Sequence, residues 1–252
     1  MITDWDYSDR AHTYDKRADY SGAAVAKLLR ATGCEPGTRV ADVGAGTGKL
    51  TKDLLKYGLS VVSIEPNDNM RKYGEKNTEG SDVTWMAGVG EHTGLHESSV
   101  AAAFFGSSFN VVDQATALDE VARIVQPGGW FACMWNHRDT EDPCQNRIEQ
   151  VIHSYIPSYD YGLRRQNPSE IIQRSGHFGE VGEIEERFVV KMRNEDIVEA
   201  WRSHDTLFRQ ADGLFEEVIL AISGELDGTE TEVPYFTRIW FAQLSQGSPA
   251  EI

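Results

Sequence analysis

Cysteine is scarce in this sequence, which has only three such residues among 252: Cys34, Cys133 and Cys144. They form no C-x-x-C pair, and no histidine stands beside them at the spacing of zinc ligands. We therefore expect neither a disulfide framework nor a metal site. The three thiols are interpreted as small apolar side chains, buried or half-buried.

Positive charge and long apolar runs are also in short supply. The chain has 24 Lys and Arg against 40 Asp and Glu, a formal net charge of −16, so it repels phosphate backbones and anionic lipid. The longest apolar run, residues 100–105, is too short to cross a bilayer, and residues 1–6 lack the positive and apolar regions of a signal peptide. We expect a cytoplasmic protein whose partners include neither nucleic acid nor membrane.

Apolar residues are plentiful enough for a core, at 40% of the chain, with aromatic residues at 10%. After a helix at 22–32, the pattern predicts strands at 38–43, 60–64, 83–87, 100–105 and 130–135, with helices at 49–57, from 68 onward, and at 114–125. Strands that alternate with helices predict a parallel, doubly wound sheet with right-handed crossovers.

Beyond residue 138 the alternation changes. The pattern predicts helices at 146–155, 169–175, 194–204 and 214–226, and strands at 181–190 and 234–243. We interpret this part as a helical cap inserted before the last strands.

Three glycines alternate in the loop between the first of these strands and the next helix: Gly44, Gly46 and Gly48. Such a loop lets the backbone approach a ligand closely and direct N–H groups at it. The spacing G-x-G-x-G is not the dinucleotide fingerprint, which needs G-x-G-x-x-G, and no Ser or Thr follows Gly-Lys as in a P-loop. The loop therefore favours a ligand of another class.

Two acidic residues accompany the glycine loop. Asp42 stands two residues before Gly44, where a carboxylate opposes a pyrophosphate but suits a cationic amino group or a sulfonium. Glu65 follows 23 residues after Asp42, at the carboxyl end of the next strand, where its side chain can accept hydrogen bonds from both ribose hydroxyls. A cationic nucleoside fits this pair better than a dinucleotide.

Residues 40–48, VADVGAGTG, and 64–66, IEP, closely resemble the motifs of the class I S-adenosylmethionine-dependent methyltransferases, type 11-like branch. The resemblance covers roughly residues 36–136. It implies an α/β fold with a Rossmann-like doubly wound sheet whose last strand is antiparallel, and a helical cap insertion. The implied organisation is an N-terminal arm with the first helix (1–33), an S-adenosylmethionine-binding core (34–138), and the cap with the final strands (139–252).

The resemblance implies S-adenosyl-L-methionine as cofactor and S-adenosyl-L-homocysteine as product. By position, it assigns cofactor contacts to Asp42, Gly44, Ala45, Gly46, Gly48, Glu65, Pro66, Met70, Val89, Gly90, Glu91 and Ser107, and a pairing with the cofactor carboxylate to Arg17. Val89 replaces the acidic residue that the family commonly has before the adenine-binding glycine.

No residue is an unmistakable general base. The small-molecule branch most similar to this chain has a histidine in the loop after the fourth strand, and residues 106–112 have none. His137, at the end of the fifth strand, is our first candidate base, and His204 in the cap is the second. Tyr14, in the aromatic N-terminal arm, is a candidate contact of the transferred methyl group or the acceptor. A base is optional, since proximity supplies much of the rate of a displacement.

We therefore predict a methyltransferase that acts on the oxygen or nitrogen of a small organic molecule, as a monomer or homodimer. Two alternatives stay open. One is a non-catalytic S-adenosylmethionine-binding protein, because no base is evident. The other is a nicotinamide-dependent oxidoreductase, which the spacing of the glycines disfavours.

Overall fold

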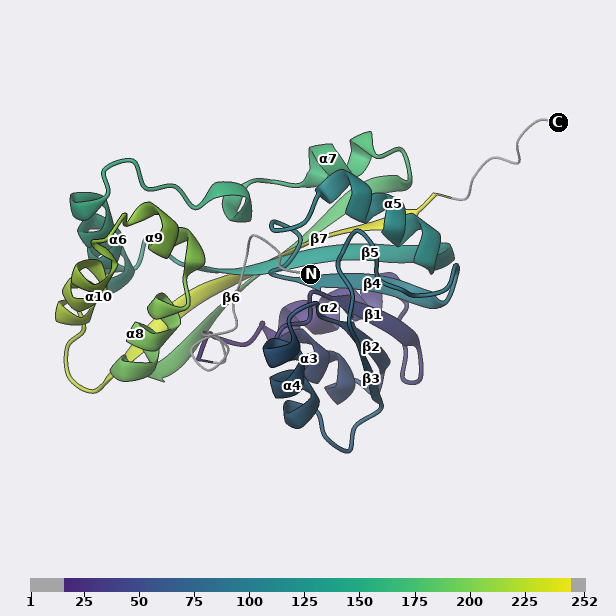
Figure 1. Ribbon diagram of the computed structural model, residues 1–252, viewed down its shortest axis with the longest axis horizontal. Coiled ribbons are helices and arrows are strands. Elements are labelled where there is room, and N and C mark those ends of the chain that lie inside the picture. The colour runs from purple at the N-terminus through teal and green to yellow at the C-terminus, as the bar shows by residue number, and fades with distance from the viewer. Residues whose placement is uncertain (1–15, 246–252) are drawn as a thin grey trace.

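The computed structural model describes residues 16–245, and a mixed seven-stranded sheet runs through it (Figure 1). The strands are β1 (Arg39–Val43), β2 (Ser60–Ile64), β3 (Val83–Met86), β4 (Val100–Gly106), β5 (Val125–Arg138), β6 (Phe178–Arg193) and β7 (Glu230–Leu244). Their order is β3-β2-β1-β4-β5-β7-β6, with β1 to β5 parallel and β7 antiparallel to both of its neighbours. The predicted fold class is confirmed.

Helices cover both faces of the sheet. They are α2 (Gly22–Thr32), α3 (Lys49–Lys56), α4 (Asp68–Asn77), α5 (Gln114–Ile124) and α7 (Ser169–Arg174). The apolar side chains of α2 and α3 join one core cluster, and those of α5 and α7 join another on the opposite face. Neighbouring residues of one strand, such as Phe104 and Phe105, are therefore both fully buried. Burial on both faces explains why these strands are continuous apolar runs in the sequence.

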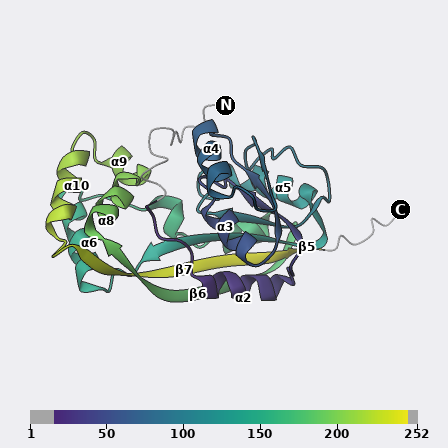
Figure 2. The ribbon, with the colours of Figure 1, turned by 90° about the horizontal axis from the view of Figure 1, so that it is seen from below.

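A second group of helices forms the cap, at one end of the long strands β6 and β7 in both views (Figures 1 and 2). The cap contains α6 (Pro143–Tyr155), the 3-10 helix η2 (Gly162–Arg165), α8 (Asn194–Arg202), α9 (Asp205–Gln210) and α10 (Phe215–Gly224). Its core includes the fully buried Trp201, Leu207 and Val218. The cap is thus assembled from two stretches of chain, one before β6 and one between β6 and β7.

The structure differs from several of the expected element bounds. β5 begins at Val125 and not at residue 130, so the Pro-Gly-Gly segment at 127–129 lies within the strand, where the pairing shifts from Val100 with Val125 to Ala102 with Trp130. The short helix α9 follows His204, which we expected to lie within the preceding helix. No helix in the described part of the chain is long and apolar enough to cross a membrane.

Candidate active site

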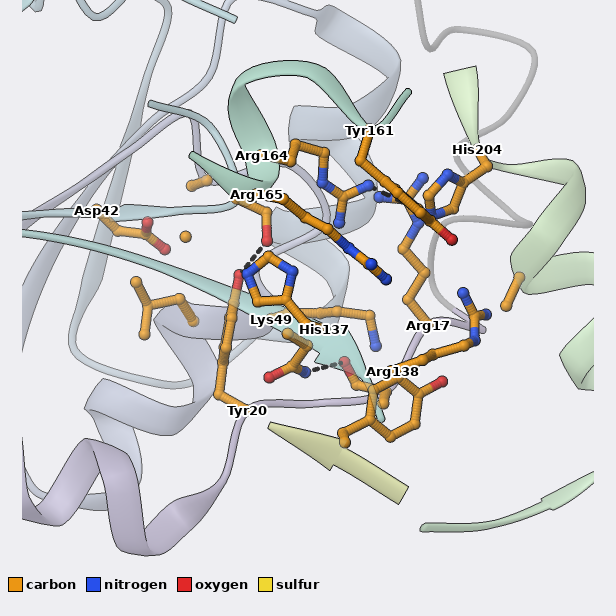
Figure 3. Close-up of a pocket in the computed structure, with 18 residues that line it drawn as sticks. Arg17, Tyr20, Asp42, Lys49, His137, Arg138, Tyr161, Arg164, Arg165 and His204 are labelled. Carbon is orange, nitrogen blue, oxygen red and sulfur yellow. Dashed lines mark hydrogen bonds between the residues drawn. The ribbon is translucent and has the colours of Figure 1, made fainter. Parts of the chain in front are cut away.

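Two adjoining pockets lie where the carboxyl ends of the parallel strands meet the cap. The loop pocket is lined by the glycine loop, the end of β2, the start of α4 and the segments that follow β3 and β4. The arginine pocket lies between the ends of β1 and β5, η2 and the turn between α8 and α9 (Figure 3). Because Arg17, Ser107 and Arg164 line both, a ligand can extend from one pocket into the other.

The glycine loop makes a tight turn against β2. Gly44, Gly46 and Gly48 all have positive φ, at 70°, 59° and 83°, which favours glycine at each position. The N–H groups of Gly44 and Ala45 both donate to the carbonyl oxygen of Ile64, at 2.8 and 3.0 Å. A Cβ atom on Gly44 would lie 2.5 Å from Cβ of Ser108, so the loop also needs glycine there for space.

The replacement Gly44→Ala is expected to lower the free energy of unfolding by about 2–4 kcal/mol, because strain at positive φ adds to the clash with Ser108. Gly80→Ala is the matched control, since Gly80 has φ of 78° with open space around its missing Cβ. The control should lower the free energy of unfolding by about 1–2 kcal/mol, from backbone strain alone. Urea unfolding measures both, and equal losses would contradict the close packing of the loop.

Glu65 is held in the loop pocket by two backbone amides. Its Oε2 accepts from the N–H of Gly46 at 2.9 Å, and its Oε1 accepts from the N–H of Asn67, also at 2.9 Å. The side chain is buried, and burial raises the pKa of its carboxyl. A carboxylate has about four acceptor positions, so the two oxygens retain capacity for donors from a ligand.

Asp42 is fully buried at the end of β1, and its two oxygens differ. Oδ2 accepts from Oγ1 of Thr51 at 2.6 Å, whereas Oδ1 is buried with no hydrogen-bond partner. Burial raises the pKa of Asp42 to about 7. A buried acceptor without a donor is costly, and Asp42 lines the arginine pocket. The geometry suits a cationic donor from a ligand at this oxygen.

The far wall of the loop pocket follows β3. Val89, Gly90 and Glu91 line it, together with Pro66 and the buried Met70. Val89 and His92 exchange backbone hydrogen bonds at 3.2 and 3.1 Å, which closes the chain into a turn. Oε1 of Glu91 accepts from the N–H of Asp113 at 2.7 Å. This wall therefore offers backbone groups and apolar surface to a planar ligand.

Two other candidates connect the pockets to the N-terminal segment. Ser107 has φ of 60°, unusual for a residue with a side chain, and its Oγ lies 2.9 Å from the hydroxyl of Tyr20. Arg17 donates from Nε to Oγ of Ser203 at 2.7 Å and from Nη2 to its carbonyl oxygen at 2.5 Å. The segment is thus tied to the cap. Tyr14 lies outside the described residues.

Both candidate bases line the arginine pocket. Burial, followed by Arg164, Arg165 and Arg238, lowers the pKa of His137 to about 3. Burial and nearby arginines also lower the pKa of His204, whose Nε2 lies 3.3 Å from Nη1 of Arg164. Both rings are neutral near pH 7 and bind protons weakly, and their roles as bases stay predictions.

The cluster of positively charged side chains that distinguishes the arginine pocket was not predicted from the sequence. Besides Arg17, the lining cations are Lys49, Arg138, Arg164 and Arg165. They come from α3, the end of β5 and η2. The only local signal is the adjacent pair Arg164-Arg165, after a stretch rich in Tyr and Pro.

Comparison with known proteins agrees with this geometry. Residues 41–133 match a family described as a methyltransferase domain. An uncharacterized methyltransferase of Mycobacterium tuberculosis is 37% identical over 136 residues, 54% of this chain and 54% of that protein. A demethylmenaquinone methyltransferase of Beutenbergia cavernae is 31% identical over 129 residues, 49% of this chain and 53% of that protein. The chain spans about half the length of these curated relatives.

Solved structures share the fold. A putative methyltransferase from an antibiotic biosynthesis pathway of Anabaena variabilis has a TM-score of 0.62 at 18% identity, over 88% of this chain and 97% of that chain. Phosphoethanolamine N-methyltransferase 2 of Haemonchus contortus, solved with S-adenosyl-L-methionine, has a TM-score of 0.57 at 15% identity, over 98% of this chain and 61% of that chain. Residues 41–133 therefore match a methyltransferase domain, and the fold of the chain is shared with solved methyltransferases.

Proposed function

We propose that this protein transfers a methyl group from S-adenosyl-L-methionine to an oxygen or nitrogen of a small organic acceptor. The observation that carries the proposal is the buried, unpartnered Oδ1 of Asp42 beside the glycine loop. A ligand with an ammonium group satisfies this oxygen, whereas a pyrophosphate would be repelled by it. The family match over residues 41–133 supports the same cofactor.

Different lining residues suit different parts of this cofactor. Asp42 would hold the ammonium group, and Glu65 would accept hydrogen bonds from the ribose hydroxyls. Met70 and Val89 would cover the adenine, with Gly90 offering its backbone. The cofactor supplies an electrophilic methyl group when bound.

The chain's own contribution is orientation and exclusion of water. Asp42 and Ser107 themselves line the arginine pocket, so an acceptor bound there would meet the methionine end of the cofactor. Holding two reactants in line converts a bimolecular displacement into an effectively unimolecular one. Cap residues such as Tyr161 and His204 form the wall of the pocket opposite the sheet and reduce its contact with water.

The proposal is tested by calorimetric titration with S-adenosyl-L-methionine, S-adenosyl-L-homocysteine, NAD and NADP. We expect micromolar binding of the two sulfur nucleosides and none of the dinucleotides, because the unpartnered carboxylate oxygen of Asp42 favours a cationic group. Binding of a nicotinamide nucleotide in their place would contradict the cofactor assignment and revive the oxidoreductase alternative. Cofactor binding without methyl transfer to any member of a broad acceptor panel would favour the non-catalytic alternative.

A further inference from the structure

The arginine pocket gathers positive charge in a chain whose net charge is −16. Five Lys and Arg side chains line it, and Asp42 is the one carboxylate among its described lining residues. Figure 3 shows Arg17, Arg164 and Arg165 converging between Asp42 on one side and His204 on the other. Such a concentration of charge suits an anionic ligand.

Lys49 and Arg165 each lie near a carboxylate of the described residues. Nζ of Lys49 lies 2.9 Å from Asp19, and Nη2 of Arg165 lies 3.8 Å from Glu149. The second distance leaves room for a closer anion.

Arg138 is the lining cation whose surroundings most favour an anionic ligand. Among the described residues, no carboxylate lies within ion-pair distance of it, and its Nε is buried with no hydrogen-bond partner. The guanidinium carbon lies 4.1 Å from the centre of the Trp201 ring and 5.8 Å from that of Tyr235. Stacking on the fully buried Trp201 fixes the guanidinium plane. Such a group presents its N–H edge to a planar oxyanion.

The cofactor does not neutralise this charge. Its ammonium and carboxylate groups cancel each other, and its sulfonium adds a positive charge. With the ammonium on Asp42 and the cofactor carboxylate on Arg17, the arginines at 138 and 164–165 still face the space for the acceptor.

We propose that the acceptor is a small carboxylic acid, bound as its anion by Arg138 and Arg165 and methylated on a carboxylate oxygen. This inference rests on the proposed function. A lone pair of the carboxylate oxygen forms the new O–CH₃ bond as the S–CH₃ bond breaks, and the electron pair of the broken bond stays on sulfur. The products are a methyl ester and S-adenosyl-L-homocysteine, and no proton moves.

An acceptor of this class agrees with the weak bases in the pocket. A hydroxyl or ammonium acceptor must lose a proton, and the lowered pKa values of His137 and His204 make both rings poor proton acceptors. A carboxylate is already ionised. A phosphate would meet the same guanidinium donors, so it forms a separate arm of the test.

The binding test uses the protein saturated with S-adenosyl-L-homocysteine and titrated with citrate, succinate and benzoate. Succinamide, benzamide, benzylamine and inorganic phosphate are the comparison ligands. We expect at least one carboxylate to bind more than tenfold tighter than its amide, and its affinity to fall as salt is added. Preference for the amine, binding of phosphate alone, or no carboxylate binding overturns the proposal. Failure to bind S-adenosyl-L-homocysteine overturns the proposed function instead.

Matched variants assign the binding to the pocket. Arg138→Gln and Arg165→Gln should each weaken carboxylate binding by more than tenfold and change the affinity for S-adenosyl-L-homocysteine by less than twofold, since neither residue lines the loop pocket. Arg138→Lys keeps the charge and serves as a control for misfolding, and it should give an intermediate loss of carboxylate affinity. Arg174→Gln, at a side chain 78% exposed on α7, should change nothing. Equal carboxylate affinities of all four variants would contradict the assignment of carboxylate binding to the arginine pocket.

A product test is independent of affinity. With methyl-labelled cofactor, the label should appear in a product that releases methanol in mild base, because methyl esters are base-labile and N-methyl groups and ethers are not. Label that survives the base treatment overturns methylation on a carboxylate.

Discussion

Replacing Glu65 with alanine is expected to weaken binding of S-adenosyl-L-homocysteine by about a hundredfold, because two hydrogen bonds to a charged group contribute about 1.5 kcal/mol each. The carboxylate is already oriented by the N–H groups of Gly46 and Asn67, so little entropy is lost when a ribose adds its hydroxyls. Calorimetry of the wild type and the variant measures the difference.

The same variant leaves the N–H of Gly46 without its acceptor, so the loop itself could loosen. A 2′-deoxy analogue of S-adenosyl-L-homocysteine separates the two causes. The wild type should bind the analogue at least tenfold more weakly, and Glu65→Ala should bind both compounds alike. Glu75→Ala, at an exposed acid on α4, is the control and should bind like the wild type. If the variant still discriminated between the compounds, the ribose contact would be wrong.

The sequence indicated the sheet and the cofactor side of the site because their signals are local. Strands buried on both faces are short apolar runs, so β2 was predicted with its observed bounds, Ser60–Ile64. Asp42 lies near the end of β1, the glycine loop and Glu65 directly follow β1 and β2, and parallel pairing brings the two strand ends together. The position of these residues therefore follows from strand order alone.

The acceptor side of the site could not be predicted from the sequence, because it forms by packing between segments that are far apart in the chain. Arg138 ends β5 and Arg164 lies in η2, and their convergence depends on how the cap packs over the sheet. The cap also takes helices from two separated stretches of chain, and no periodicity records that they share one core. The sequence pattern placed His204, a candidate base in the cap, at the end of a helix, yet it lies in the turn between α8 and α9, where it lines the pocket.

Asp42 should make cofactor binding depend on pH. Its pKa in the free protein is about 7, so below pH 7 the carboxyl is mostly neutral and must lose a proton before it can pair with an ammonium group. The affinity for S-adenosyl-L-homocysteine should therefore rise as pH increases from 5.5 to 7, approaching about tenfold per pH unit at the acid end. Above about pH 8 the ligand's own α-amino group loses its proton, so the rise should stop.

Asp42→Asn removes the titrating group and keeps the shape of the side chain, so its affinity should be at least tenfold lower at pH 7 and nearly constant between pH 5.5 and 7. Asp53→Asn is the matched control. Asp53 is also a buried acid with a pKa raised by burial, but it lies on α3 outside both pockets. The control should keep the slope of the wild type, since its carboxyl does not touch the ligand. A wild-type affinity that is constant over this range, or a slope that persists in Asp42→Asn, would show that another group receives the ammonium.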